Sequence, residues 1–314
     1  MMITLKEAAT KILAANKILI TAHVQPDGDA IGSTLALMQM LRALGKEAQI
    51  FIDDTVRKNL QALPHFEEIR RPRDGEKFDA DLIVVLDTSI ERIGNVRKLT
   101  DAPILNIDHH VTNSGEGVEL YVETKAAATC EIVFKLAREL DATITPEIAT
   151  CLYTGLATDT GFFQFSNTRA ETLAVASELI RCGVNPNFIS EQLEKKSLAE
   201  VRGLSAALNS LKMFYGDKVA GMILDHATAK TFDSTEGFID EIRVIETVDV
   251  AFLITEKAPN FCRVSMRSKG VDVSKIAAKL GGGGHIRAAG CTLKTTLDEA
   301  EKILVAAIGE AFNN

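Results

Sequence analysis

Residues 23–33 read His-Val-Gln-Pro-Asp-Gly-Asp-Ala-Ile-Gly-Ser and join two segments with different hydrophobic patterns. The apolar, β-prone residues 17–22 before them predict a buried strand. After them, apolar residues recur at a helical period from Ile31 to Leu41, and the pattern ends at Gly45. The polar residues are therefore expected in a strand-to-helix loop, the position at which open α/β sheets hold their ligands.

This loop contains one imidazole and two carboxylates, from His23, Asp27 and Asp29. Pro26 and Gly28 favour a tight bend, because proline fixes φ and glycine tolerates positive φ. Two carboxylates held close together repel each other unless one is protonated or a cation lies between them, so the loop predicts a metal site. The alternative is that Asp29 is the N-cap of the helix and Asp27 a turn residue. The loop by itself leaves both interpretations open.

Three further strands are predicted in the first half of the chain, at residues 47–52, 82–86 and 104–107. Two of them end in possible metal ligands, because Asp87 follows residues 82–86, and Asp108, His109 and His110 follow residues 104–107. Asp159 lies in a polar loop after a predicted helix at 146–157. Short buried strands that alternate with helical patterns, here at 5–15, 129–140, 146–157 and 168–182, are typical of a parallel α/β sheet.

The pattern changes between residues 185 and 214, where a long charged helical stretch predicts the connection between two domains. Beyond it, strands are expected at 219–224, 250–255, 261–267 and 290–293, and helices at 273–280 and 297–312. The glycine-rich residues 281–285 between them are expected to form a loop. We therefore expect a domain at 1–185, a helical linker at 186–214 and a smaller domain at 215–314.

Length, charge and cysteine usage limit the class of protein. A chain of 314 residues suits two domains, and a net charge of −8 argues against non-specific coating of nucleic acid. The five cysteines include no Cys-x-x-Cys pair, which favours reduced thiols. The sequence shows no signal peptide and no apolar run long enough to span a bilayer. These properties predict a soluble cytoplasmic protein.

The loops that follow parallel strands converge on one edge of the sheet. Eight possible metal ligands are expected to meet there: His23, Asp27, Asp29, Asp87, Asp108, His109, His110 and Asp159. Mixed imidazole and carboxylate donors suit Mn²⁺ or a similar divalent ion. Two such ions about 3.5–4 Å apart, sharing a carboxylate, would stabilise both the attacking and the leaving oxygen at a phosphorus atom. The residues therefore predict hydrolysis of phosphate esters or anhydrides.

Five motifs make the sequence similar to a known family. H-x-x-P-D-G-D-A-I-G-S from His23, L-D-T-S from Leu86, D-H-H from Asp108 and T-D-T-G from Thr158 resemble the four motifs of the DHH phosphoesterase superfamily. G-G-G-G-H-x-x-A-A-G from Gly281 resembles the signature of the DHH-associated C-terminal domain. The resemblance covers essentially the whole chain. It implies a Rossmann-like, parallel-sheet α/β DHH domain, a smaller α/β C-terminal domain and an active-site cleft between them.

The resemblance also implies a role for each candidate ligand. Six side chains would hold two metal ions, with His23 and Asp27 on one, Asp29, His109 and Asp159 on the other, and Asp87 bridging both. Asp108 and His110 would form the catalytic pair. Asp108 would orient ligands, and His110 would face the scissile phosphate, where it stabilises charge or helps to protonate the leaving group.

The glycine-rich segment is implied to bind substrate. Consecutive glycines let backbone N–H groups approach a phosphate closely, and neighbouring histidine and arginine side chains add further donors. The candidate substrate contacts are Gly282, Gly283, Gly284, His285, Arg287 and Arg267, the last at the end of its predicted strand. The alternative is a surface role for the two arginines and a structural role for the histidine.

Within the superfamily, the chain most resembles the two-domain branch of bifunctional oligoribonucleases and pAp phosphatases. This implies a Mn²⁺-dependent enzyme that hydrolyses short oligoribonucleotides (nanoRNA) to mononucleotides and 3′-phosphoadenosine 5′-phosphate (pAp) to AMP. Two alternatives stay open: a phosphodiesterase for pApA or cyclic di-AMP, and a nucleotide-binding sensor without activity. No long nucleic acid and no membrane are expected as partners. A homodimer is expected only because symmetric dimers are common.

Overall fold

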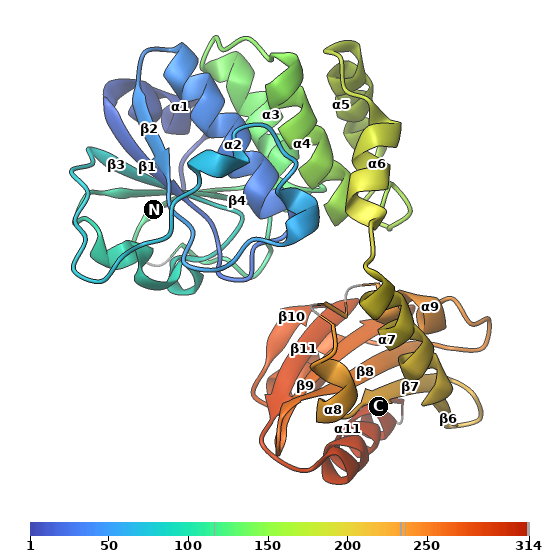
Figure 1. The fold of residues 1–314 in the computed structure, drawn as a ribbon. Helices are drawn as coiled ribbons and strands as arrows, with labels where there is room; N and C mark the ends of the chain where they lie inside the picture. Colours follow the sequence, from blue (N-terminus) through green and yellow to red (C-terminus); the bar gives the residue numbers. More distant parts are fainter. Residues whose placement is uncertain (116, 233, 236, 313–314) are drawn as a thin grey trace. The chain divides into compact units, whose positions relative to one another are not determined.

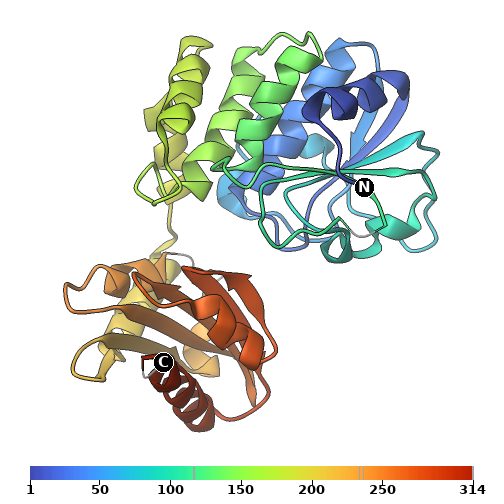
Figure 2. The same ribbon diagram turned by 180° about the vertical axis from the view of Figure 1, so that it is seen from behind.

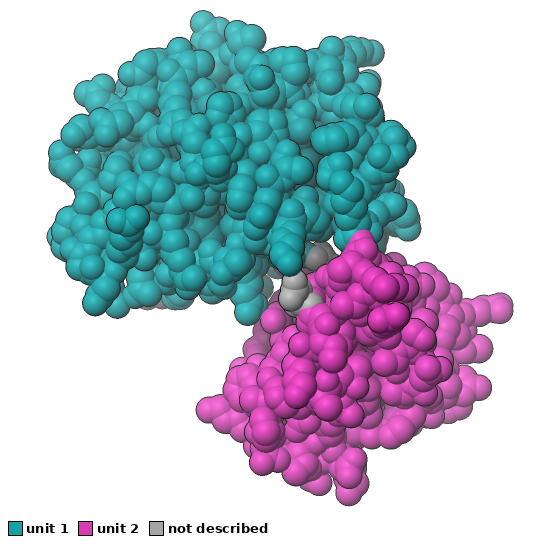
Figure 3. Space-filling view, viewed as in Figure 1, with its two compact units in different colours: residues 1–195 teal, residues 196–314 magenta. Residues whose placement is uncertain are grey.

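The chain divides into two compact units. The computed structural model describes residues 1–115, 117–232, 234–235 and 237–312. Unit 1 is Met1–Lys195 and unit 2 is Lys196–Asn314, coloured teal and magenta in Figure 3. No helix of the described residues is both long and apolar enough to cross a membrane. All five cysteines are unpaired.

The predicted helical linker at 186–214 contains two helices and a short strand. It contains α6 (Pro186–Glu194) in unit 1, and α7 (Leu198–Asn209) and β6 (Lys212–Phe214) in unit 2. α6 ends at Glu194, and Ser197 is the N-cap of α7, where its side chain and that of Glu200 form a reciprocal capping box.

Unit 1 is built on a five-stranded parallel sheet of order β2-β1-β3-β4-β5. Its strands are β1 (Lys17–Thr21), β2 (Glu47–Ile50), β3 (Leu82–Leu86), β4 (Ile104–Asp108) and β5 (Glu119–Val122). The edge strand β5 is absent from the sequence prediction, because it is short and only partly buried. The three strands whose ends carry the candidate ligands, β1, β3 and β4, are direct neighbours.

The two faces of this sheet are covered differently, as Figures 1 and 2 show from opposite sides. Val84 of β3 packs against helices, whereas its neighbours Ile83 and Val85 pack against Val96 and Leu99 of the 3-10 region. The helices of unit 1 besides α6 are α1 (Leu5–Ala14), α2 (Gly28–Ala43), α3 (Thr129–Glu139), α4 (Pro146–Asp159) and α5 (Ala170–Arg181). The 3-10 helices are η1 (Lys58–Leu60), η2 (Phe66–Glu68), η3 (Ile90–Arg92) and η4 (Gly94–Lys98).

Unit 2 contains a six-stranded mixed sheet of order β10-β11-β9-β8-β7-β6, in which only β7 and β8 are parallel. The remaining strands are β7 (Val219–Leu224), β8 (Val250–Ala258), β9 (Phe261–Ser268), β10 (Gly283–His285) and β11 (Ala288–Leu293). Helices cover both faces of this sheet (Figure 1). Apolar side chains are buried between the sheet and these helices. These helices are α7, α8 (His226–Ala229) and α9 (Phe238–Arg243) on one face, and α10 (Val273–Lys279) and α11 (Leu297–Phe312) on the other.

The glycine-rich segment is partly a strand, so the expectation of a loop over 281–285 is wrong for its second half. Gly283–His285 forms β10 and pairs antiparallel with β11. A Cβ added to Gly282 would lie 2.1 Å from the carbonyl oxygen of Gly290, and Gly284 has a φ of +141°. Glycine therefore lets β10 lie directly on β11, and a run without side chains carries no hydrophobic pattern to reveal the strand.

Candidate active site

The first ligand group consists of His23, Asp27 and Asp87, whose donor atoms lie within 4.8 Å of one another. His23 follows β1, and its Nε2 lies 3.7 Å from Asp27 Oδ2 and 3.5 Å from Asp87 Oδ2. The other ring nitrogen, Nδ1, lies 2.9 Å from the carbonyl oxygen of Val24. Because a carbonyl only accepts, Nδ1 donates, and Nε2 faces the two carboxylates.

Asp27 is both a helix cap and a possible ligand. It is the N-cap of α2, and its Oδ1 accepts from the backbone N–H groups of Asp29 and Ala30 at 3.1 and 3.0 Å. Its other oxygen, Oδ2, faces His23. The alternative that made Asp29 the cap is therefore wrong, because α2 begins at Gly28, two residues before the start that an Asp29 cap would give.

Asp29 is fully buried and is oriented by the start of α3. Its Oδ2 accepts from the backbone N–H of Thr129 at 2.6 Å, and its Oδ1 accepts from that of Cys130 at 2.8 Å. A helix N-terminus favours negative charge, so this geometry stabilises the ionised carboxylate. Burial and the charges of Asp87 and Asp159 oppose it and raise the pKa of Asp29.

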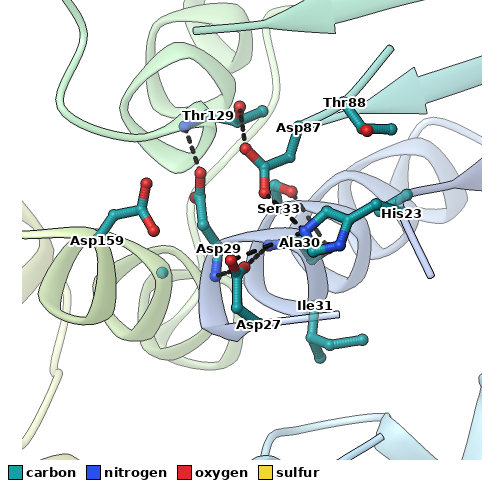
Figure 4. A network of polar contacts seen from close by, with 12 residues as sticks. His23, Asp27, Asp29, Ala30, Ile31, Ser33, Asp87, Thr88, Thr129 and Asp159 are labelled. Atoms are coloured by element: carbon teal, nitrogen blue, oxygen red, sulfur yellow. Dashed lines mark hydrogen bonds and ion pairs between the residues drawn. The ribbon is translucent and has the colours of Figure 1, made fainter. Parts of the chain in front are cut away.

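Asp87 lies between the two ligand groups. Its Oδ2 faces His23, and its Oδ1 accepts from the Thr129 hydroxyl at 3.1 Å (Figure 4). The same Oδ1 lies 3.5 Å from His109 Nε2. Its φ of 61° is left-handed, an uncommon backbone conformation for a residue other than glycine. The strand end therefore turns sharply at Asp87, and each carboxylate oxygen points to a different histidine.

The second ligand group consists of Asp29, His109 and Asp159, again within 4.8 Å. Nε2 of His109 lies 3.3 Å from Asp159 Oδ2 and 4.0 Å from Asp29 Oδ2. Its Nδ1 lies 3.3 Å from the carbonyl oxygen of Ala126, the same arrangement as at His23. Asp159 is the last residue of α4, and Figure 4 shows its carboxylate beside Asp29. Burial raises the pKa of Asp159 to about 6.

Asp108 and His110 form a third arrangement at the end of β4. Asp108 Oδ1 accepts from His110 Nδ1 at 2.7 Å and from the backbone N–H groups of His109 and His110 at 2.7 and 3.1 Å. Its Oδ2 accepts from Asn113 Nδ2 at 2.6 Å. Both oxygens are thus occupied by protein donors, and the carboxylate orients His110.

A cation fits the chemistry of this donor set. His109 Nε2 is buried and has no hydrogen-bond partner among the described residues, although three carboxylates face it. Burial favours neutral imidazoles, but the facing carboxylates outweigh it and raise the pKa of His109 to about 12 and that of His23 to about 10. Burial alone would raise the pKa of Asp87, yet the imidazoles of His109 and His23 lower it well below its usual range. Such a site attracts positive charge strongly, and a divalent ion competes for the same lone pairs as the protons.

In unit 2, strand register brings two of the predicted substrate contacts into one row. Ala288 of β11 pairs with Arg267 on one side and with His285 on the other. Burial lowers the pKa of Arg267, whose Nη1 donates to the carbonyl of Met266 at 3.0 Å. Arg287 lies outside this row, in the turn between β10 and β11, where its Nη1 donates to the carbonyl of Val271 at 3.4 Å. Gly282 precedes β10, and Gly283 and Gly284 lie within it.

Sequence reasoning missed three residues that support the site. Thr129 donates to both Asp29 and Asp87, and the buried Asn106 and Asn113 form hydrogen bonds next to Asp108. Asn106 left a signal, because it interrupts the apolar strand β4. Thr129 left none because its partners are distant in sequence, and Asn113 left none because it lies in a loop without a periodic pattern.

Comparison with known proteins decides the family. The sequence matches the N-terminal domain of the DHH family over residues 17–156 and the DHHA1 domain over residues 230–314. A curated relative, the bifunctional oligoribonuclease and PAP phosphatase NrnA of Thermus thermophilus, is 37% identical over 295 residues, which are 93% of this chain and 89% of the relative. The chain belongs to the DHH family of phosphoesterases. It is a hydrolase of phosphoester bonds, and its family depends on metal ions.

Two further likenesses support this assignment. The cyclic-di-AMP phosphodiesterase PdeA of Listeria monocytogenes is 26% identical over 327 residues, which are 95% of this chain but 48% of that protein. The crystal structure of an exopolyphosphatase-related protein from Bacteroides fragilis has a TM-score of 0.89 and 27% identity, and the alignment covers 98% of this DHH protein and 96% of that chain. The expected fold, a parallel-sheet DHH domain followed by a smaller α/β domain, is confirmed.

Proposed function

We propose that this DHH phosphoesterase hydrolyses short oligoribonucleotides to mononucleotides and pAp to AMP, with two Mn²⁺ ions as cofactors. One observation carries the proposal: two groups of imidazole and carboxylate donors are linked by Asp87, whose two oxygens face His23 and His109, in a chain that is 37% identical to a protein named for these two activities. The mixed nitrogen and oxygen donors fit Mn²⁺ better than a metal that prefers thiolates.

Six side chains would hold the two ions: His23, Asp27 and Asp87 on one side, and Asp29, His109 and Asp159 on the other, with Asp87 joining the second group through its oxygen near His109. When bound, two divalent cations supply Lewis acidity at the phosphate and lower the pKa of an attacking water. Asp87 keeps the two groups together, because each of its oxygens faces a different histidine.

We assign proton transfer to His110. Burial favours its neutral form, but the hydrogen bond to Asp108 and the charge of Asp87 outweigh burial and raise the pKa of His110. Because Nδ1 is occupied by Asp108, Nε2 is the atom assigned to the substrate. A protonated imidazole held in this way suits stabilisation of a phosphate oxygen and donation to the leaving group.

We assign substrate binding in unit 2 to the row of Arg267 and His285, with backbone N–H groups of Gly282, Gly283 and Gly284 and a smaller contribution from Arg287. A planar guanidinium with five donors suits bidentate recognition of a phosphate. We expect Arg267→Ala to raise KM by about tenfold or more, with unchanged Mn²⁺ affinity, because the ligands lie in unit 1. Steady-state kinetics and calorimetric Mn²⁺ titration measure the two quantities, and an unchanged KM would contradict the assignment.

A second candidate, hydrolysis of pApA or cyclic di-AMP, is supported by the likeness to PdeA. That likeness spans about half of PdeA, whereas 89% of the Thermus relative is matched, so the oligoribonuclease activity is favoured. The acidic net charge of −8 also fits short substrates, since a long strand would need an extended basic track. The five unpaired cysteines fit a reducing compartment, and we place the enzyme in the cytoplasm.

The deciding experiment is product analysis of the purified protein with Mn²⁺. RNA of two to five nucleotides, pAp, pApA, cyclic di-AMP and pyrophosphate are offered in parallel. Mononucleotides from the short RNA together with AMP from pAp are the expected result. Cleavage restricted to the di-adenylates would establish the second candidate instead. Metal binding without hydrolysis of any of these compounds would contradict both and favour a nucleotide-binding sensor.

A further inference from the structure

Two buried asparagines connect the segment that follows β3, which carries Asp87, with the end of β4, which carries Asp108. Asn106 is fully buried in the middle of β4, and Asn113 follows the Asp108–His110 segment and is also buried. A buried amide without partners is unfavourable, so their hydrogen bonds show what each one holds. Neither residue is a metal ligand or a substrate contact in the proposed function.

Asn106 connects the ends of two neighbouring strands. Its Nδ2 donates to the carbonyl of Val85 in β3 at 3.1 Å and to the carbonyl of Thr88 at 2.8 Å. Thr88 directly follows Asp87, the residue with left-handed backbone. Asn106 therefore holds the backbone turn at Asp87, the residue that carries the shared carboxylate.

Asn113 connects the same turn to Asp108. Its Nδ2 lies 2.6 Å from Asp108 Oδ2, 2.7 Å from Asn106 Oδ1 and 3.1 Å from the carbonyl oxygen of Thr88. Its Oδ1 accepts from the backbone N–H of Gly115 at 3.0 Å. This arrangement determines the orientation of the amide, because a flipped Asn113 would place oxygen against three acceptors and nitrogen against a donor.

We propose that Asn106 and Asn113 form an amide clamp that sets the position of Asp87 relative to Asp108 and His110. The Thr88 carbonyl accepts from both amides, which holds the unfavourable backbone of Asp87 in place. The Asp108 carboxylate is held at Oδ2 by Asn113 while its Oδ1 orients His110. The two asparagines are thus positioning residues for the hydrolysis. The inference rests on the proposed role of Asp87 as the shared metal ligand.

The competing interpretation is that the asparagines only satisfy buried carbonyls and stabilise the fold. The two interpretations differ in what a substitution changes. A purely structural role predicts a lower unfolding temperature with unchanged kcat and Mn²⁺ affinity in the folded protein. The clamp predicts loss of kcat and of Mn²⁺ affinity at temperatures where the variant is fully folded. Loss of a residue that hydrogen-bonds to the metal-binding side chains typically lowers metal affinity or activity by about 10–100-fold.

The test compares Asn113→Ala and Asn113→Asp with substitutions at Asn95. Asn95 also donates a side-chain hydrogen bond to a carboxylate, Asp53 Oδ2 at 2.8 Å, but on the exposed surface. Asn95→Ala and Asn95→Asp therefore remove the same kind of bond, and Asn95→Asp creates the same pair of like charges. We measure the dissociation constant for Mn²⁺ by calorimetry, kcat and KM at saturating Mn²⁺, and folding by circular dichroism.

For Asn113→Ala we expect kcat and Mn²⁺ affinity to fall by about tenfold or more, with KM changed by less than about threefold. Asn113→Asp should lower kcat and Mn²⁺ affinity further, because its carboxylate faces three acceptors: Asp108, Asn106 Oδ1 and the Thr88 carbonyl. The Asn95 variants should keep wild-type values. Folded Asn113→Ala with wild-type kcat and Mn²⁺ affinity would overturn the clamp. If Asn113→Asp does not fold, Asn113→Ala decides.

Calorimetry also separates failure of the clamp from failure of the proposed function. If the wild-type protein hydrolyses none of the offered nucleotides, the proposed function fails. The Mn²⁺ dissociation constants of Asn113→Ala and Asn95→Ala still test whether the amides position Asp87, because metal binding requires no substrate.

Discussion

Gly155→Ala tests whether close packing of α4 on α2 sets the position of Asp29. A Cβ at Gly155 would lie 2.3 Å from Cys130 Sγ, 2.8 Å from Asp29 Oδ1 and 2.9 Å from Asp29 Cα. Ordinary contact begins near 3.4 Å, so Oδ1 must move away by about 0.6 Å, the difference between 3.4 and 2.8 Å. That oxygen accepts from the Cys130 N–H, and the movement therefore strains the anchor of the carboxylate.

The expected loss of stability follows from two opposing effects. Alanine in place of glycine within a helix stabilises by up to about 1 kcal/mol. Overpacking of a buried site costs about 1–3 kcal/mol, and the upper part of this range applies because Asp29 Cα belongs to the backbone. The net destabilisation is about 1–2 kcal/mol, which lowers the unfolding temperature of a unit of this size by roughly 2–8 °C. Displacement of Asp29 should also weaken Mn²⁺ binding by about tenfold or more.

Calorimetric Mn²⁺ titration and thermal unfolding of Gly155→Ala measure both effects. Gly270→Ala is the control, because no atom lies within 4 Å of a Cβ added there. The double variant Cys130→Ala/Gly155→Ala removes the sulfur that lies 2.3 Å from the new Cβ but leaves both Asp29 contacts. The double variant should recover only the part of the stability lost through the Cys130 contact, and little of the Mn²⁺ affinity. Wild-type Mn²⁺ affinity in Gly155→Ala would refute the argument that this packing positions Asp29.

Three further predictions concern the site and the surrounding fold. Asp87→Ala and His109→Ala should each abolish Mn²⁺-dependent turnover and keep native circular dichroism; retained turnover in both would exclude the metal assignment. Chelation of divalent ions should stop hydrolysis, and free Mn²⁺ at about 100 times its dissociation constant should then stabilise the protein by about 2.7 kcal/mol, seen as a higher unfolding temperature. An unfolding temperature that Mn²⁺ does not raise would exclude binding of Mn²⁺ to the folded state. The hydrogen bond from Arg42 lowers the pKa of Glu68 in the folded protein. The ionised Glu68 therefore stabilises the fold above its unfolded-state pKa of about 4.3, and this stabilisation is lost as the pH falls through its folded-state pKa. Glu68→Gln should therefore be less stable than wild type near neutral pH and equal to it in strong acid in urea titrations; a pH-independent difference would contradict the ion pair.

Local patterns predicted those parts of the site that lie on contiguous segments. The buried runs of β1, β3 and β4 are visible in the sequence because strands covered on both faces are almost entirely apolar. The residues that end them are polar, so the sequence pattern alone predicts His23, Asp87 and Asp108 at one edge of a parallel sheet. The resemblance to the DHH family then assigned each ligand to a metal ion, and that assignment stays a prediction. The distances place His23 with Asp27 and Asp87, and Asp29 with His109 and Asp159. They also place Asp87 with Asp108, His109 and His110.

Tertiary contacts determined how each ligand is held. Asp29 accepts from residues 100 and 101 positions away, and Thr129 reaches Asp87 across 42 positions. No local pattern records such pairs, because they depend on the order of the strands and on the approach of α3 to the sheet. The bonds from Asn106 and Asn113 to residues 85 and 88 span 18 to 25 positions and likewise depend on the order of the strands.

The sequence by itself determined the two-unit organisation, the parallel sheet and the kinds of side chain at its edge. These depend on hydrophobic periodicity and on turn residues, which act between neighbours in the chain. Only the tertiary structure decided that Asp27 rather than Asp29 caps α2, that Asp87 turns one oxygen to each histidine, and that glycines 283 and 284 belong to a strand. These features depend on which atoms meet in space, and that is set by packing between segments far apart in the chain.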